Sequence, residues 1–287
     1  MKTGFLIVNY NDYASTKKLI DNIKGYSNID LILVVDNKSS DDSVKKLKRL
    51  NIDKLKLICC EENKGYSNAI NTGSKYLIDN LGKCNIIVSN ADIIINNEDD
   101  IGRLIKLLNK KEIGVVAPTI FERGKLNRGW KQVSPLMECM LNIPFIHRWF
   151  RKRFVYYNES HYKGDTSIID IASGCFFLIK SDTMEKINYL DDNVFLYYEE
   201  NILAKKLEKI GKKIIVDNNT VIIHNHSVTI DKNVKKIKKY KIQKKSQYYF
   251  EKEYNDANIM ECFLLRFTYY ISLVILSIYY FMKDLIS

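Results

Sequence analysis

Short apolar runs alternate with helical patterns through the first 90 residues, and this alternation limits the possible folds more than any other feature of the chain. The apolar runs are rich in β-forming residues and lie at Phe5–Val8, Leu31–Val35, Leu55–Ile58 and Ile86–Val88. Between them, apolar residues recur at helical spacing in 16–23, 44–50 and 66–81. Strands joined by helices form right-handed crossovers. The sequence therefore predicts an α/β fold with a mostly parallel sheet and a ligand site at the C-terminal ends of its strands.

The second half of the chain is less regular. Strand patterns lie at Val115–Ala117, Ile168–Ile179, Ile214–Val216 and Thr220–Ile223, and helical patterns lie at Ser181–Ile187 and Asn201–Ile210. Gly211 is expected to end the last of these helices. Four of the aromatic residues in the mixed section 123–165 are expected to pack in the core, with ligand binding as the alternative: Trp130, Trp149, Tyr156 and Tyr157.

The net charge of +11 is concentrated near the C-terminal end. Between Asp231 and Tyr254 nine lysines stand against three acids, and the apolar and aromatic segment 262–282 follows. This order predicts attachment to an anionic membrane surface and counts against a nucleic-acid partner. The uncharged stretch Phe267–Met282 makes about 24 Å of helix against roughly 30 Å of hydrocarbon. A marginal span, an interfacial helix and packing on the domain or in a homodimer stay open, and we expect monotopic attachment.

Asn90-Ala91-Asp92 lies between two apolar runs, so Asp92 stands where a buried strand ends. A carboxylate there can hold a divalent cation against a phosphorylated ligand, although turn formation and helix capping are commoner reasons for such an Asp. His224 and His226 follow the strand pattern 220–223. Either imidazole is a candidate second ligand, or is merely hydrogen-bonded. The sequence has no zinc motif.

Polar residues follow each of the first three predicted strands, and a glycine also follows the third. They are Asn9, Asn11, Asp36, Asn37, Asn63, Gly65 and Asn68. A carboxylate at a strand end can accept a hydrogen bond from a base or a ribose, and a glycine permits close backbone approach. Ordinary βα loops contain the same residue types. The chain has neither GxGxxG nor GxxxxGK[ST], which counts against dinucleotide enzymes and P-loop NTPases.

Glu199 and Glu200 follow the aromatic stretch Phe195–Tyr198 and are expected at the start of a helix. The helix dipole favours acids at that position. A carboxylate in a partly desolvated pocket can also act as a general base. The two adjacent acids leave both interpretations open.

Taken together, these motifs occur in the order seen in family 2 glycosyltransferases, over roughly residues 4–228. The resemblance is carried by Val8–Asn11, Val35–Asp41, Glu62–Gly73, Asn90–Asp92, Ser173–Ile179, Phe195–Glu200 and His224–Ser227. Within that family the set most resembles the bacterial rhamnosyltransferase-like branch. Three positions depart from the family pattern: Asn90 stands where many members have Asp, Glu200 stands where Asp is usual, and Ile202 replaces a common acid.

The resemblance implies a GT-A fold, a nucleotide-diphospho-sugar donor, Mg²⁺ or Mn²⁺ as cofactor, and inversion at the anomeric carbon. It places Glu200 as the catalytic base, with Glu199 beside it, and assigns the metal to Asp92 and His224. Asn11 and Asp36 would hold the base and ribose, and Asn63 and Gly65 would lie near the nucleotide. The remaining candidates for nucleotide-sugar binding are Asn9, Asn37, Asn68, Asn90 and Gly174.

The expected organisation is a GT-A domain over 1–230, divided near residue 115 into a nucleotide-sugar-binding half and an acceptor-binding, catalytic half. A lysine-rich helical segment would follow at 231–261 and an apolar membrane-associating helix at 262–287. Six cysteines without paired spacing, and an N-terminus with no signal-peptide core, predict the cytoplasmic face of the cell membrane.

The expected reaction moves a sugar, with dTDP-rhamnose as the suggested donor, to a lipid-linked saccharide in bacterial surface polysaccharide synthesis. One alternative is a sugar nucleotidyltransferase, but the loop Asn9–Ser15 has no Gly, Lys or Arg to bind a pyrophosphate. The other is a non-catalytic, membrane-associated nucleotide-sugar-binding protein. A membrane adaptor without enzymatic activity would explain the C-terminal tail but not the ordered polar residues at the strand ends.

Overall fold

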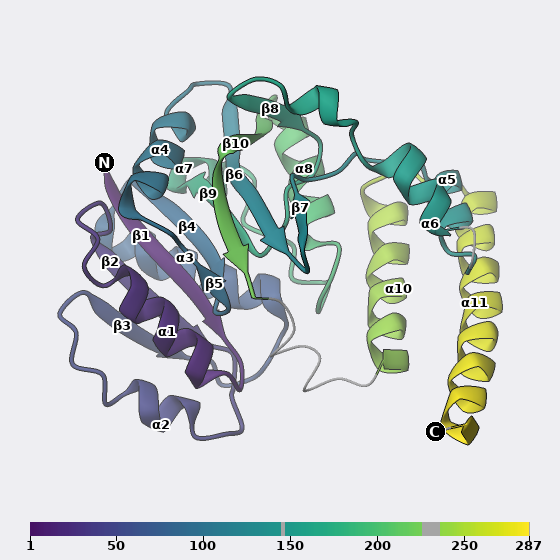
Figure 1. The fold of residues 1–287 in the computed structure, drawn as a ribbon, viewed down its shortest axis with the longest axis horizontal. Coiled ribbons are helices and arrows are strands. Elements are labelled where there is room, and N and C mark those ends of the chain that lie inside the picture. The colour runs from purple at the N-terminus through teal and green to yellow at the C-terminus, as the bar shows by residue number, and fades with distance from the viewer. Residues whose placement is uncertain (145–146, 226–235, 287) are drawn as a thin grey trace.

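A single mixed sheet forms the centre of the molecule, in a computed structural model that describes residues 1–144, 147–225 and 236–286 (Figure 1). Its strand order is β3-β2-β1-β4-β9-β6-β10-β5, with β7 paired to β6 and β8 paired to β10. Some predicted features lie outside the described residues: His226, and the part of the lysine-rich segment that contains Lys232 and Lys235.

The N-terminal half of the sheet is parallel, as predicted. Its strands are β1 (Lys2–Asn9), β2 (Leu31–Asp36), β3 (Leu55–Cys59) and β4 (Cys84–Asn90), and its helices are α1 (Tyr13–Ile23), α2 (Ser43–Leu47) and α3 (Tyr66–Leu81). In register, Asn9 pairs with Asp36, and Val8 pairs with Asn90. Because parallel strands end at the same edge, the polar residues that follow them meet there.

Two apolar layers cover the sheet, because successive strand side chains point to opposite faces. Phe5 and Ile7 pack with α1, α2 and α4 (Glu98–Leu108) on one face. Leu6 packs on the other face with α3, α7 (Ser181–Lys186) and α8 (Glu199–Lys209). The sheet is therefore buried on both sides, which explains the nearly unbroken apolar runs of its strands.

The C-terminal half of the sheet mixes parallel and antiparallel pairing, with β6 parallel to β10. Its strands are β5 (Ile93–Ile94), β6 (Ile113–Glu122), β7 (Lys125–Asn127), β8 (Thr166–Ile169), β9 (Phe176–Lys180) and β10 (Lys213–His224). β9 lies antiparallel between β4 and β6. After β6 the chain turns back in the antiparallel strand β7, and residues 128–165 then make a long excursion before β8 and β9 return to the sheet. The predicted strand 168–179 is split, and Gly174 lies in the loop before β9.

The excursion and the C-terminal region contain mainly helices: α5 (Pro135–Leu141), α6 (His147–Phe150), η1 (Arg151–Val155), η2 (Glu159–Tyr162), α10 (Lys236–Glu253) and α11 (Ile259–Ile286). α10 and α11 stand side by side in opposite directions, and α5 packs on α11 (Figure 1). Core packing was the wrong expectation for Trp149 and Tyr156, whose exposed fractions are 63% and 45%. Both sit in a short helical excursion that no sheet covers.

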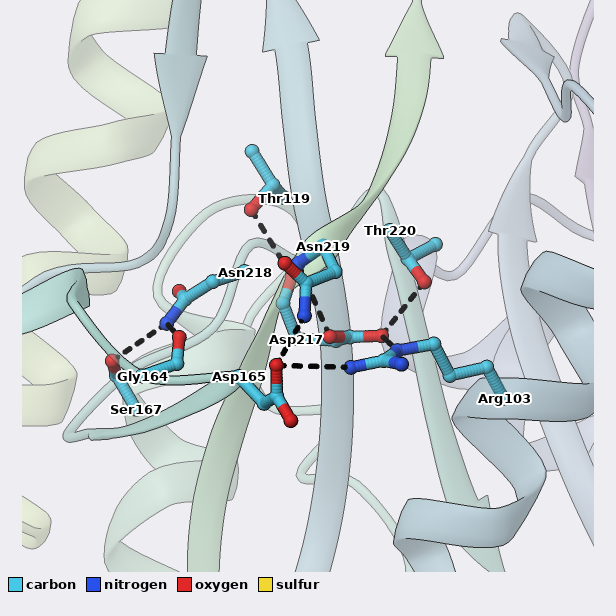
Figure 2. A network of polar contacts seen from close by, with 9 residues as sticks. All are labelled: Arg103, Thr119, Gly164, Asp165, Ser167, Asp217, Asn218, Asn219 and Thr220. Atoms are coloured by element: carbon cyan, nitrogen blue, oxygen red, sulfur yellow. Dashed lines mark hydrogen bonds and ion pairs between the residues drawn. The ribbon is translucent and has the colours of Figure 1, made fainter.

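One wide bulge joins the two predicted strands 214–216 and 220–223 into the single strand β10. Asp217 pairs with Pro118 of β6, but the next pair is Val221 with Thr119. Pro118 has no backbone N–H, so the ladder is already interrupted there. The buried Asp217 carboxylate accepts hydrogen bonds from Arg103 Nε at 2.6 Å and from Thr220 Oγ1 at 2.7 Å (Figure 2). These bonds hold the bulge closed, and the shifted register carries His224 to the end of β6.

We predict that Asp217→Asn lowers the free energy of unfolding by about 2 kcal/mol, because the arginine and the bulge lose a buried charged acceptor. Urea unfolding followed by circular dichroism measures this. Asp165→Asn is the matched control, since Asp165 lies 3.9 Å from the same Arg103 but is 82% exposed. The control should change stability by less than about 0.5 kcal/mol. Equal losses in the two variants would contradict the role of Asp217.

Candidate functional site

Asn9 and Asp36 form a buried pair at the ends of β1 and β2. Asn9 Nδ2 donates to Asp36 Oδ2 at 2.7 Å, and Asn9 Oδ1 accepts from Thr16 Oγ1 at 2.7 Å. The other Asp36 oxygen accepts from the backbone N–H of Ser39 at 2.9 Å. Asn9 is fully buried and Asp36 is 1% exposed. Asn9 therefore orients the Asp36 carboxylate and does not reach the surface of the edge itself.

Asn11 organises the loop after β2. Its backbone is left-handed, with φ of 52°, a conformation that Asn tolerates better than most residues. Its Oδ1 accepts from the backbone N–H of Ser40 at 2.7 Å, and its own N–H donates to Ser39 Oγ at 2.8 Å. The first two strand-end loops are thereby tied together.

The start of α3 packs against a segment from the far half of the chain. Asn37 Nδ2 donates to Asn63 Oδ1 at 3.0 Å and to the Gly65 carbonyl at 3.1 Å. Gly65 has φ of +101°, and a Cβ at this position would lie 2.3 Å from the Phe195 carbonyl oxygen. The close approach that this glycine permits is therefore to its own chain. Asn68 also faces this segment, since its Nδ2 donates to Asp192 Oδ2 at 3.1 Å.

Tyr66 links the two halves of the edge, and the sequence analysis did not select it. Its hydroxyl lies 2.7 Å from Asn90 Oδ1 and 3.0 Å from the Gly174 carbonyl oxygen. Burial, together with the nearby acidic groups, raises the pKa of Tyr66 well above its usual value. The hydroxyl therefore stays a hydrogen-bond donor. An aromatic residue directly after the Gly65 turn was the available signal.

Asp92 and His224 meet at this edge, although they are 132 positions apart in sequence: Asp92 follows β4, and His224 is the last residue of β10. His224 Nε2 lies 3.2 Å from Asp92 Oδ1, and His224 Nδ1 lies 3.1 Å from Glu122 Oε2. Burial lowers the pKa of the imidazole, but hydrogen bonds to Asp92, Cys175 and Glu122 outweigh it and raise the pKa to about 12. The neighbouring carboxylates thus favour the protonated imidazole, and a bound cation would compete with that proton.

The Asp92 and His224 pair fits a hard divalent cation. Two adjacent ligands with bonds of about 2.1 Å lie about 3 Å apart, close to the spacing seen here. No cluster of three or more His, Cys, Asp or Glu side chains in the described ranges could hold a metal. Mg²⁺ and Mn²⁺ sites on nucleotides commonly have few protein ligands, because phosphate and water oxygens complete the shell. Glu122 stands where an outer carboxylate orients a metal-binding imidazole.

Glu199 and Glu200 begin α8 beside a small cavity whose lining also includes Tyr66, Gly174 and Leu190. Burial raises the pKa of Glu200 to about 6. Burial and the charge of Glu200 raise the pKa of Glu199 well above its usual value. Oε2 of Glu199 is buried without a hydrogen-bond partner in the described part of the chain. Burial thus favours the neutral form of both carboxyls, more strongly for Glu199, and Glu200 is the member with a pKa suited to accepting a proton.

A family model described as "Glycosyl transferase family 2" matches residues 5–187. Among curated proteins, the chain is similar to "Low-salt glycan biosynthesis hexosyltransferase Agl10" of Haloferax volcanii, with 28% identity over 231 residues. That alignment covers 78% of this chain and 67% of the relative.

Among solved structures, the chain is similar to GalNAc-T7 with UDP, GalNAc and Mn²⁺, at a TM-score of 0.63 and 13% identity. The match covers 80% of this chain but only 44% of GalNAc-T7. The mannosyltransferase PcManGT of Pyrobaculum calidifontis, in complex with GDP-Man and Mn²⁺, matches with a TM-score of 0.60 and 15% identity, over 96% of this chain and 75% of that one. At these identities the likeness is one of fold, and the predicted GT-A fold is confirmed.

Proposed function

The chain belongs to glycosyl transferase family 2, and from this premise we propose that it moves a hexose from a nucleotide-diphospho-sugar to a hydroxyl group with inversion at the anomeric carbon. The proposal rests mainly on the position of Tyr66. Its hydroxyl contacts Asn90, which belongs to the same motif as Asp92, and Gly174, which lies beside Glu200. A metal pair and a raised-pKa carboxylate thus share one edge of the sheet. Family membership also counts against the sugar nucleotidyltransferase alternative.

In the proposed reaction Glu200 takes the proton of the acceptor hydroxyl as its oxygen attacks the anomeric carbon. The bond to the nucleoside diphosphate breaks on the opposite face. A divalent cation, when bound by Asp92 and His224, supplies positive charge against the leaving diphosphate. Asp36, held by Asn9, would accept from the base or ribose, and Glu122 would hold His224 in orientation.

For the donor we expect a hexose nucleotide, supported by the hexosyltransferase relative and by fold neighbours solved with UDP and with GDP-Man. The rhamnosyltransferase-like motifs keep dTDP-rhamnose among the candidates. A lipid-linked saccharide remains our proposed acceptor, at the cytoplasmic face of a membrane. The relative's printed role in glycan biosynthesis supports an acceptor of the saccharide class.

We predict that at least one of UDP-, GDP- and dTDP-hexoses raises the melting temperature by several degrees with Mn²⁺, because a ligand that binds the folded state stabilises it by mass action. Differential scanning fluorimetry with and without Mn²⁺ measures this. Asp92→Asn should weaken the affinity for the donor in the presence of Mn²⁺ about 10-fold or more. Glu122→Gln should weaken the same affinity roughly 10 to 100-fold, as is typical when a partner of a metal ligand is lost. No stabilisation by any donor would refute nucleotide-sugar binding.

We predict that Glu200→Gln lowers the transfer rate roughly 100 to 10,000-fold while donor affinity stays within about twofold, because only proton removal is lost. In the unmodified protein, kcat should fall as the pH drops below about 6, since protonated Glu200 cannot act as a base. Release of free nucleoside diphosphate in the presence of acceptor measures the rate. Turnover near that of the unmodified protein would refute the assignment of the base.

Membrane attachment is supported by the distribution of side chains on α11, which buries polar residues and exposes apolar ones. The face that packs on α5 and α10 carries small polar residues, with Thr268 and Ser272 buried. The opposite face exposes large apolar side chains, including Phe263, Phe267 and Val274. The segment Ile259–Tyr279 is long and apolar enough to cross a membrane, and 17% of its most apolar window is buried. An outward apolar face of this size suits a lipid surface.

The orientation of α11 favours a helix lying in the membrane plane over a spanning one. α10 runs alongside it, with the Tyr240 and Tyr269 rings stacked at 6.1 Å and Arg266 over the Tyr248 ring at 4.5 Å. A perpendicular α11 would carry the lysines of α10 into the hydrocarbon, at a cost of about 2.5 kcal/mol or more for each charge. Lysines near the headgroups instead gain about 1 kcal/mol each from anionic lipid.

We predict that the protein floats with liposomes that contain about one third anionic phosphatidylglycerol at roughly 0.15 M salt. Replacing Phe263 and Phe267 together by Ser should lower the bound fraction at least about tenfold, because two apolar side chains leave the lipid. Leu126→Ser is the control, since Leu126 is also half-exposed but lies on β7. Failure of the unmodified protein to float would refute membrane attachment, and a purely dimeric role for α11 would then be tested by its mass in solution.

A further inference from the structure

Two consecutive tyrosines with left-handed backbones precede the catalytic pair. Tyr197 has φ of 71° and Tyr198 has φ of 69°. This conformation is strained for a bulky residue and persists only where surrounding contacts compensate. Tyr198 is the N-cap residue of α8, and its side chain makes no capping hydrogen bond. We call Tyr197 and Tyr198 the left-handed corner. The direction in which α8 starts, and therefore the orientation of Glu199 and Glu200, depends on the contacts that hold this corner.

The Tyr198 side chain is held by helices that lie outside the central sheet and its covering layers. Its hydroxyl donates to Glu138 Oε2 on α5 at 3.2 Å, and Gln247 Nε2 on α10 donates to the same oxygen at 2.6 Å. The Tyr198 ring lies 5.5 Å from the ring of Phe250, which is fully buried. Burial raises the pKa of Tyr198 well above its usual value, so the hydroxyl keeps its proton. Glu138 of α5 is thus the common acceptor that links Tyr198 to α10.

The two residues before the corner, Phe195 and Leu196, are hydrogen-bonded on both sides. Ser246 Oγ on α10 donates to the Leu196 carbonyl at 2.8 Å. On the opposite side, the backbone N–H of Tyr66 donates to the Phe195 carbonyl at 3.0 Å. Residues 195–198 therefore lie between the start of α3, which belongs to the nucleotide side, and the C-terminal helix α10. A shift of α10 or α5 would reach the catalytic pair through main-chain and side-chain bonds.

The outward-facing helix α11 is fastened to the same α5 that carries Glu138. At the end of α5, Asn142 Nδ2 donates to Thr268 Oγ1 at 3.2 Å, and Ser272 Oγ donates to the Asn142 carbonyl at 2.5 Å. Asn142 is 5% exposed and Ser272 is fully buried. The surface proposed to meet lipid and the corner before the catalytic pair are thus attached to one short helix.

We propose that Glu138 is a positioning residue for the transfer reaction: by accepting from Tyr198 and Gln247 it holds the left-handed corner that aims Glu199 and Glu200. The C-terminal helices then serve the catalytic site as well as the anchor. This inference rests on the proposed role of Glu200 as base. It adds that truncating or displacing α10 and α5 weakens catalysis even where the nucleotide site is intact.

The test compares Tyr198→Phe, which removes only the hydroxyl, with Glu138→Leu and the conservative Glu138→Gln in the full-length chain. We expect kcat to fall about tenfold or more in the first two, because small misplacements of a catalytic group are costly. Donor affinity, measured by fluorimetry with nucleotide sugar and Mn²⁺, should stay within about twofold. Glu138→Gln keeps an acceptor oxygen for Tyr198 and should retain most of kcat.

Tyr249→Phe is the matched control, because Tyr249 lies on α10 and its hydroxyl, like that of Tyr198, donates to a carboxylate, here Asp191 Oδ2 at 2.8 Å. Asp191 keeps a second donor in Tyr254 at 2.6 Å, so kcat should be unchanged. Hydrogen exchange over residues 195–203 gives a readout that needs no activity, and amides there should exchange faster in Tyr198→Phe and Glu138→Leu, but not in the control.

Two results would overturn the proposal: a kcat within about twofold of the unmodified protein in both test variants, or donor affinity that falls in parallel with kcat. An unmodified protein that transfers no sugar from any donor would instead refute the proposed function. In that case hydrogen exchange alone decides whether Glu138 holds the corner, and exchange equal to that of the control would overturn it.

Discussion

The antiparallel strand β9 is the constraint on which the rest of this structure depends. Its backbone pairs with β4 on one side and β6 on the other, so its hydrogen bonds join the two halves of the sheet. The same strand brings the Cys175 carbonyl to the backbone N–H of Asn90 at 2.8 Å. Gly174 therefore faces Tyr66, and the candidate base and the metal motif share an edge. Without β9 these groups would belong to two separate sheets.

The bulge in β10 determines a second alignment, that of His224 with the end of β6. Three residues, 218–220, have no partner in the ladder with β6, and the buried Asp217 beside them is compensated by Arg103 and Thr220. Because the register resumes with Val221, His224 arrives level with the end of β6 and within reach of Glu122. A charged cluster remote from the edge thus determines which side chains meet there, which is a common use of bulges near functional sites.

The C-terminal helices are the elements to which both proposed roles, membrane attachment and positioning of the candidate base, are assigned. α11 turns its polar side chains inward and its aromatic ones outward, the reverse of a helix on a soluble core. Its polar face gains hydrogen bonds to α5, and α5 and α10 in turn hold the Tyr198 corner. Glu251, buried in α10, has its pKa raised to about 8 by burial and by the charge of Glu138, so it is mainly neutral near pH 7. Glu138 therefore accepts from Tyr198 and Gln247 without a second full charge beside it.

Local patterns in the sequence predicted the strands and helices of the first half, the polar residues at their ends, and the acids at the start of α8. These features depend on contacts between residues a few positions apart, which periodicity records. Tyr66, Glu122 and Glu138 were missed, and Gly65 was interpreted as a ligand contact, because their partners are remote: Glu122 and His224 are 102 positions apart, and Glu138 and Tyr198 are 60 apart. The sequence by itself determined the α/β alternation and the chemistry available at the strand ends. Only the tertiary structure decided which of those groups meet, since strand register and helix docking depend on packing across the whole chain and not on any local pattern.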